Sequence, residues 1–179
     1  NVDELAKLTN LTNLDLSNCG NLQNVDLLAN LSNITKLSLS EVKINVDVLI
    51  NLTNLTNLDL SSCNLQNVDS LANLTNLTNL DLSSCYELQN VDELANLTKL
   101  TNLNLSSCGS IVQPQKEVMT TRKEVIEYQD KIRFVMALID GNTKVLSGYK
   151  DNTSLDLSRC NLQNVDVLAN LTNLTNLNL

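Results

Sequence analysis

The sequence predicts an α/β solenoid, with short strands stacked into a parallel sheet on the concave side and short 3₁₀ or single-turn α segments on the convex side. Three observations predict this fold. A unit of 21 to 23 residues recurs along the 179-residue chain. Each unit contains a Leu-x-Leu stretch with a period of two, which is typical of a strand. Each unit also contains a stretch with a period of three, which suits a short 3₁₀ segment. Units of this length stack as turns that pack only on their neighbours.

The unit is clearest between residues 67 and 89, NVDSLANLTNLTNLDLSSCYELQ. Its apolar positions are Val68, Leu71, Leu74, Leu77, Leu80, Leu82, Cys85 and Leu88. Similar spacings elsewhere predict about seven turns in all. Because strands of successive turns run the same way, they are expected to pair in parallel with their leucines facing a shared core.

An aspartate stands where the convex segment of most turns begins. These residues are Asp3, Asp26, Asp47, Asp69, Asp92 and Asp166. Aspartate is favoured at the N-cap of a helical segment, where its side chain accepts a backbone N–H. We therefore expect these aspartates to be N-caps rather than catalytic groups.

The five cysteines occupy one position of the unit, which Val42 fills in the second turn. They are Cys19, Cys63, Cys85, Cys108 and Cys160. Disulfide frameworks have irregular spacings, and zinc sites need clustered pairs. A cysteine that valine can replace is expected to be a small buried hydrophobe.

Composition excludes several functions. The net charge of −8 argues against nucleic acid as a partner, and no apolar run is long enough for membrane insertion. Histidine is absent, which removes the commonest general base and metal ligand. No nucleophile elbow or phosphate loop is present. We expect no enzymatic activity, no catalytic residue, no metal and no cofactor.

The repeat divides the chain into three parts. Residues 1–111 hold repeats 1 to 5, residues 112–154 form an insertion that runs into a degenerate repeat, and residues 155–179 continue the repeats. Solenoids need polar end caps, and neither end shows one. The repeat array is therefore expected to be truncated at both ends.

The sequence of the insertion predicts a helix over roughly 115–130. Proline is favourable at the first position of a helix, and Pro114 opens the segment. Two alternatives remain for residues 131–146. The segment forms a hairpin around Asp140-Gly141, or the helix continues and Gly141 is its C-cap. The hairpin is favoured because residues 133–139 would be apolar on every side of a helix. The insertion is expected to act either as a recognition element or as a tolerated loop.

The run LANLTNLTNLDLS at 71–83 resembles leucine-rich repeats of the 22-residue class. It looks like the repeats of internalin-type surface proteins of bacteria and of SDS22-like regulators of protein phosphatase 1. The resemblance covers residues 1–111 and 155–179 and implies a leucine-rich repeat solenoid. One departure is that internalin-type repeats carry asparagine where this chain has cysteine.

The resemblance implies a protein-interaction scaffold that binds a protein partner through the concave strand face, the 112–154 insertion, or both. The concave face is expected to present columns of small polar groups. The predicted partner-binding residues are Asn57, Asp59, Asn79, Asp81, Asn102, Asn104, Asp156, Lys131, Arg133 and Phe134.

Two alternatives to this scaffold are a self-assembling structural element, which would associate end to end, and a bacterial surface adhesin. Free thiols and the many Asn-x-Ser/Thr triplets favour a cytoplasmic location. The bacterial cell surface is the alternative location.

Overall fold

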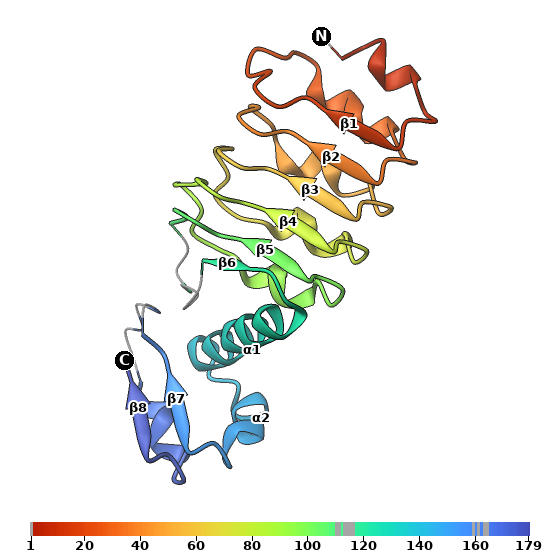
Figure 1. Ribbon diagram of the computed structural model, residues 1–179. Coiled ribbons are helices and arrows are strands. Elements are labelled where there is room, and N and C mark those ends of the chain that lie inside the picture. Colours follow the sequence, from red (N-terminus) through yellow and green to blue (C-terminus); the bar gives the residue numbers. More distant parts are fainter. Residues whose placement is uncertain (1, 110–111, 113–116, 159, 161, 163–164) are drawn as a thin grey trace.

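The chain forms a curved stack of turns, followed by a helix and a second, smaller stack (Figure 1). The computed structural model describes residues 2–109, 112, 117–158, 160, 162 and 165–179. The strands are β1 (Asn13–Asp15), β2 (Lys36–Ser38), β3 (Asn57–Asp59), β4 (Asn79–Asp81), β5 (Asn102–Asn104), β6 (Val118–Met119), β7 (Ser154–Asp156) and β8 (Asn176–Asn178). The 3₁₀ segments are η1 (Leu5–Lys7), η2 (Val25–Asn30), η3 (Val46–Leu49), η4 (Asp69–Asn73), η5 (Asp92–Asn96), η6 (Ser147–Tyr149) and η7 (Asp166–Asn170). The α-helices are α1 (Arg122–Ile139) and α2 (Thr143–Leu146).

Strands β1 to β5 pair in parallel and in strict register, so the same position of every turn forms a row across the sheet. Leu58 of β3 lies opposite Leu80 of β4, and Asp59 lies opposite Asp81. Strand β6 adds antiparallel to β5, and β7 pairs in parallel with β8 in a separate sheet. This confirms the predicted solenoid with a parallel concave sheet and short 3₁₀ segments on its convex side.

The leucines at each repeat position stack on those of the next turn and form one continuous core. In the fourth turn, Leu71, Leu74, Leu77 and Leu82 are fully buried. The core continues through Val125 and Ile132 of helix α1, so the insertion shares the apolar interior of the repeats.

The threonines and asparagines between the leucines join one turn to the next. Thr56, Thr78 and Thr101 each donate a side-chain hydrogen bond to the threonine carbonyl of the preceding turn, at 3.0–3.1 Å. Asn54 and Asn76 do the same to carbonyls of the preceding convex segment, at 2.9 Å. The asparagine side chains supply hydrogen bonds to carbonyls of the preceding turn, and the threonine hydroxyls add to the backbone hydrogen bonds that the threonine carbonyls already accept. Their recurrence is therefore structural.

The cysteine column also links successive turns. The thiols of Cys63, Cys85 and Cys108 donate to the carbonyls of Leu39, Leu60 and Leu82 at 3.2, 3.3 and 2.9 Å. Cys63, Cys85 and Cys160 are buried, as predicted for small hydrophobes, whereas Cys108 is partly exposed and Cys19 is exposed. A thiol can therefore stand in this position because it is compact, apolar and still able to donate one weak hydrogen bond.

Burial raises the pKa of the Cys63 thiol from 9.0 to about 11 and that of Cys85 to about 12. Both thiols stay protonated in the folded chain at a pH where the unfolded chain has begun to lose those protons. The free energy of unfolding is therefore unaffected below pH 9 and falls as the pH rises from 9 towards 12. We expect the melting temperature to fall over this range, and to fall less steeply in Cys85→Val, which removes one of the titrating groups. If the melting temperature fell equally steeply with pH in the wild type and in Cys85→Val, the raised pKa of Cys85 would be contradicted.

The aspartates do not cap the convex segments, so that prediction is wrong. In three turns the capping side chain belongs to the asparagine two residues earlier. Asn45, Asn67 and Asn90 accept the backbone N–H of Asp47, Asp69 and Asp92 at 3.1, 3.2 and 2.8 Å. The aspartate is the first or second residue of the segment. Its negative charge there interacts favourably with the free N–H groups at the N-terminus of the segment.

Helix α1 begins later than the sequence indicated, at Arg122 rather than near residue 115. Thr121 and Glu124 form a capping box: the Thr121 hydroxyl accepts the Glu124 N–H at 3.3 Å, and the Glu124 carboxylate accepts the Thr121 N–H at 3.1 Å. Upstream, Val118 and Met119 are held extended by pairing with β5. The expected role of Pro114 lies outside the described residues.

The favoured hairpin over residues 131–146 is wrong, and the alternative of a continuing helix is confirmed. Helix α1 runs to Ile139, and Gly141 follows its C-cap with a φ of +63°, the left-handed conformation that terminates many helices. A helix that is apolar on all sides is stable when both faces are covered. Ile132, Val135 and Leu138 are buried among the repeats and the segments that follow the helix.

Candidate functional site

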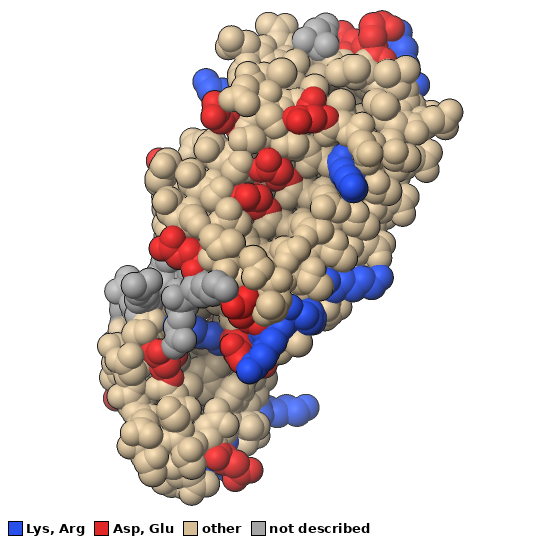
Figure 2. Space-filling model, viewed as in Figure 1, with Lys and Arg blue, Asp and Glu red and all other residues tan. Residues whose placement is uncertain are grey.

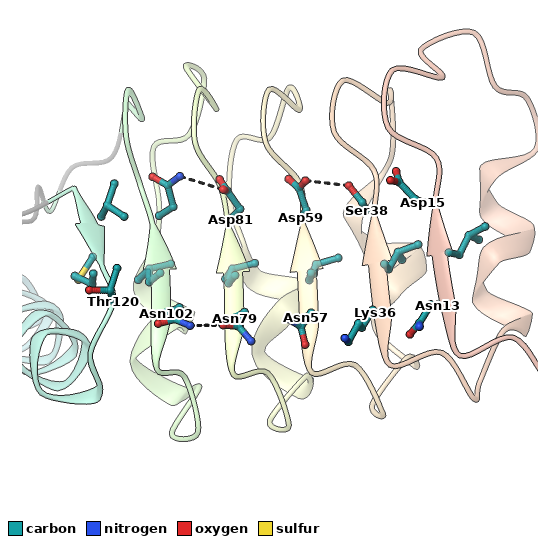
Figure 3. A pocket seen from close by; sticks show the side chains of 18 residues that line it. Asn13, Asp15, Lys36, Ser38, Asn57, Asp59, Asn79, Asp81, Asn102 and Thr120 are labelled. Carbon is teal, nitrogen blue, oxygen red and sulfur yellow. Dashed lines mark hydrogen bonds between the residues drawn. The ribbon is translucent and has the colours of Figure 1, made fainter.

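The concave face of the first sheet carries a groove of about 600 Å³ (Figure 3). Its floor is the backbone of the strands at their central positions, where the leucine side chains turn into the core, and two rows of polar side chains rise on either side. One row is Asn13, Lys36, Asn57, Asn79 and Asn102, and the other is Asp15, Ser38, Asp59, Asp81 and Asn104. The rows are straight because the strands are in register, so the spacing within each row is the strand spacing of about 4.8 Å.

The acidic row is held rigid by hydroxyl groups of its own strands. Each carboxylate or amide oxygen accepts both the N–H and the hydroxyl of the serine two residues later, with N···O distances of 2.8–3.1 Å and O···O distances of 2.6–2.7 Å. The pairs are Asp15–Ser17, Asp59–Ser61, Asp81–Ser83 and Asn104–Ser106. Because Asn104 repeats the arrangement of the aspartates, the geometry does not require a charge.

Hydrogen bonds also run along the acidic row, from turn to turn. Ser38 donates to the second carboxylate oxygen of Asp59 at 2.9 Å, and Asn104 donates to that of Asp81 at 3.0 Å. At Asp15 the hydrogen bonds from Ser17 lower the pKa of the carboxyl below its usual value. The row therefore presents ordered carboxylates that are pre-positioned for a ligand that donates hydrogen bonds.

The opposite row consists of amides with one cation. The side chains of Asn79 and Asn102 hydrogen-bond to each other, and the Asn57 oxygen accepts from Thr56 at 2.9 Å. Lys36 is the cation that lines the groove among the described residues. Asn57, Asp59, Asn79, Asp81, Asn102 and Asn104 all lie in this groove, so the structure brings six of the ten predicted contact residues together.

Asp156 and Lys131 lie elsewhere, in a cavity of about 800 Å³ between helix α1 and strand β7. The Lys131 ammonium donates to the Ser158 carbonyl at 2.9 Å, which ties the helix to the second sheet. Asp156 accepts the Ser158 N–H at 2.9 Å, as the aspartates of the first sheet do with their serines. These two predicted residues are therefore not part of the concave groove.

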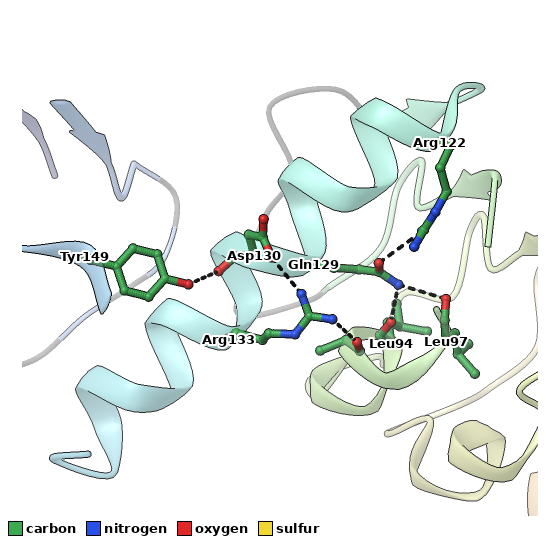
Figure 4. A network of polar contacts seen from close by, with 8 residues as sticks. Leu94, Leu97, Arg122, Gln129, Asp130, Arg133 and Tyr149 are labelled. Carbon is green, nitrogen blue, oxygen red and sulfur yellow. Dashed lines mark hydrogen bonds and ion pairs between the residues drawn. The ribbon is translucent and has the colours of Figure 1, made fainter. Parts of the chain in front are cut away.

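Arg133 and Phe134 have structural contacts in the chain itself. One face of α1 closes the last turn of the first stack, where Gln129 donates to the carbonyls of Leu94 and Leu97 at 2.7 and 3.0 Å (Figure 4). Arg133 donates to the carbonyl of Ala95 and pairs with Asp130 at 2.6 Å.

Phe134 lies on another face of α1 and is 1% exposed. Its ring packs edge-on against Tyr149, with the ring centroids 4.6 Å apart. Its burial leaves no surface for a partner, so we withdraw Phe134 as a contact residue.

Several groove residues had no part in the predicted set. Asp15 and Ser38 extend the acidic row towards β1, and their place in the repeat could have identified them. Val118, Met119 and Thr120 line the far end of the groove because β6 joins the sheet there. A two-residue antiparallel strand has no distinctive sequence pattern, so these three residues could not have been found.

Within the described residues no group of three or more metal-ligating side chains converges. Every buried side-chain polar atom there has a hydrogen-bond partner. None of the helices so described combines the length and apolar character needed to cross a bilayer.

The concave surface is acidic, whereas cations gather along one side of the molecule near α1 (Figure 2). Three carboxylates and one ammonium line the groove: Asp15, Asp59, Asp81 and Lys36. The groove is thus a rigid, polar and negatively charged surface.

The repeats, the parallel ladder and the 3₁₀ segments are those of a leucine-rich repeat solenoid. The family described as "Leucine Rich repeats (2 copies)" matches residues 53–96, which span β3, η4, β4 and η5. Leucine-rich repeats are typically interaction scaffolds without enzymatic activity. No curated protein is similar enough to be matched.

Two solved structures of internalins from Listeria monocytogenes share this architecture. One (inlF) is 29% identical, with a TM-score of 0.53 over 59% of this chain and 32% of that chain. The other, internalin C2 (inlC2), is 24% identical, with a TM-score of 0.54 over 97% of this chain and 63% of that chain. This chain therefore spans less than two thirds of either structure, and the second similarity shows the fold alone.

Proposed function

We propose that this chain is a protein-interaction scaffold that binds a partner protein through the concave groove of β1 to β5. The observation that carries the proposal is the pair of polar rows, which backbone pairing of the strands holds in register along the groove. Pre-organised polar groups lose little conformational entropy when a partner binds. The insertion supports the groove by closing its far end with Val118, Met119 and Thr120.

The convex face supports this choice by contrast. Its repeated asparagines, such as Asn54 and Asn76, donate to carbonyls of the preceding turn. The carboxylates of Asp59 and Asp81 are instead partly exposed and point into the groove (Figure 3). Surface groups that remain able to accept hydrogen bonds at fixed positions are suited to recognition.

A cation placed in the groove is expected to block the partner. Asn57 lies at the middle of the groove, where arginine adds bulk and charge without breaking a backbone hydrogen bond. We expect Asn57→Arg to weaken partner binding by at least about tenfold, which corresponds to about 1.4 kcal/mol. The matched control is Asn51→Arg, an exposed asparagine on the opposite side of the same turn.

The test begins with quantitative affinity capture from extracts of the expressing cells, comparing the wild type with both variants. A protein captured by the wild type and by Asn51→Arg, but lost on Asn57→Arg, is then titrated in purified form by calorimetry. Partners that bind Asn57→Arg as tightly as the wild type would show that the groove is not the binding surface.

The self-assembling element and the surface adhesin remain alternatives, as do the cytoplasmic and cell-surface locations. No observation on the described residues favours self-assembly or adhesion over the scaffold function. We propose a binding role for the groove, because its hydroxyl and carboxylate groups, such as those of Ser38 and Asp59, hydrogen-bond to each other along the acidic row.

A further inference from the structure

No helix or loop closes over the concave groove in the part of the chain that is described. Its lining residues come from strands β1 to β6 and from Thr120, which directly follows β6. Helix α1 instead packs on η5, where Gln129 and Arg133 donate to backbone carbonyls. The concave face of β1 to β5 is therefore an open sheet face along which a segment of a partner protein can lie (Figure 3).

Three carboxylates of this groove have no described cation as an ion-pair partner. Asp15, Asp59 and Asp81 line one side of the groove, and Lys36 lines the opposite side. The ion pairs of the described residues lie beside η1 and on α1, and none of them includes Lys36 or a groove carboxylate. The groove therefore presents an excess of negative charge that its own chain leaves for a partner.

Asp59 and Asp81 each keep an acceptor position open. In both residues Oδ1 accepts the N–H and the hydroxyl of the serine two positions later. Oδ2 accepts one hydrogen bond, from Ser38 at 2.9 Å in Asp59 and from Asn104 at 3.0 Å in Asp81. Because a carboxylate has about four acceptor positions, Oδ2 of each aspartate can accept a further donor from outside the chain.

The register of the sheet places these two aspartates side by side. Asp59 lies opposite Asp81 in the parallel pair of β3 and β4, so their Cα atoms are about 4.8 Å apart. Two negative charges at such a separation repel each other, and a cation between them removes the repulsion. A guanidinium has five N–H donors in a planar fork and can donate to two carboxylates at once, whereas an ammonium is a compact point charge. The spacing therefore favours arginine over lysine.

We propose that the concave groove binds a segment of a partner protein that carries arginine, and that the guanidinium bridges Asp59 and Asp81. The inference rests on the proposed scaffold function and names the chemistry of the partner. Asp15, two strands away from Asp59, is placed to meet a second cation of the same segment. Charge complementarity of this kind selects among partners and speeds their encounter.

The test uses a library of random peptides displayed on phage. The library is selected on the purified full chain and counter-selected on Asn57→Arg, so that the retained peptides are those that need the groove. We expect these peptides to be enriched in arginine. Replacing that arginine with lysine in a synthetic peptide is expected to weaken binding several-fold, because an ammonium does not bridge the two carboxylates in the same way.

The decisive variant is Asp59→Asn, which removes one charge of the pair and keeps the shape of the side chain. Asn104 shows that an amide in this row still accepts the serine N–H and hydroxyl. The Ser38 hydroxyl can then accept from the new amide and donate to Ser17, whose hydroxyl oxygen lies at 2.6 Å. We expect the retained peptides to bind Asp59→Asn at least about tenfold more weakly than the wild type.

The matched control is Asp26→Asn, which makes the same change in net charge at an exposed position of η2 and is expected to leave binding unchanged. If Asp59→Asn does not fold, Asp81→Ser takes its place, since Ser38 shows that this row accommodates serine.

Retained peptides that lack arginine, or that bind Asp59→Asn as tightly as the wild type, overturn the inference while leaving the groove as the binding surface. Equal binding of the arginine and lysine peptides overturns the bridging guanidinium. A counter-selection that leaves no peptide also overturns the inference, and the capture experiment with Asn57→Arg then decides on the scaffold function separately.

Discussion

Replacing Leu74 with alanine is expected to destabilise the folded chain by about 2–5 kcal/mol, the range for a fully buried leucine. Leu74 is 0% exposed and lies directly after η4, inside the leucine stack of the fourth turn. Its neighbours belong to turns that are themselves fixed by backbone pairing, so they cannot collapse into the space that the substitution leaves. Denaturant unfolding followed by circular dichroism measures the effect as a shift of the midpoint.

The chain provides a matched control for this substitution. Leu8 occupies the same place in the first turn, within Leu-Thr-Asn-Leu, but it is 51% exposed. Leu8→Ala therefore removes the same atoms with little loss of burial, and we expect it to cost less than about 1 kcal/mol. If the two substitutions had equal effects, the repeat position itself would determine stability, rather than burial between neighbouring turns.

Replacing Gln129 with methionine is expected to destabilise the chain by about 1–3 kcal/mol. Gln129 is 1% exposed, and its amide is the shared donor for the carbonyls of Leu94 and Leu97 at the end of η5. Methionine has a similar length but cannot donate, so each carbonyl loses one of its two hydrogen bonds and keeps the one from a backbone N–H, of Leu97 and Leu100 respectively. A hydrogen bond of this kind contributes about 0.5–1.5 kcal/mol.

Gln89→Met is the control for Gln129→Met, because Gln89 is exposed and the exchange is chemically the same. We expect it to change stability by no more than about 0.5 kcal/mol. Hydrogen exchange in the Gln129→Met protein should become faster in α1 and η5 together, since the amide joins these two elements. An unchanged unfolding midpoint would mean that water replaces the lost donor.

The repeats were predictable because every layer contains the same residue types at the same spacing. Leu77, Leu80 and Leu82 identify the core face and the strand from their periods alone, and the strict register then places Asp59 beside Asp81. Six predicted contact residues share the concave groove for this reason. The local sequence pattern is sufficient to predict the structure wherever each turn repeats its neighbour.

The insertion was less predictable because long-range contacts determine its structure. The apolar run around Val135 looked unsuited to a helix, yet it is buried because the helix is covered on more than one face. The start of α1 could have been read from Thr121 and Glu124, which form a capping box spaced three residues apart. The role of Gln129 depends on η5, more than thirty residues earlier, and no sequence pattern indicates it.

The central claim is that helix α1 and the repeats share one core, which holds the concave face rigid and ends the first sheet at β6. Hydrogen exchange followed by mass spectrometry tests it most directly on the full chain. We predict that the amides of α1 around Val125 and Ile132 exchange as slowly as those of β4 and β5, because both lie in the same cooperative unit. Exchange in α1 as fast as in an exposed loop, with β4 and β5 still protected, would contradict this account.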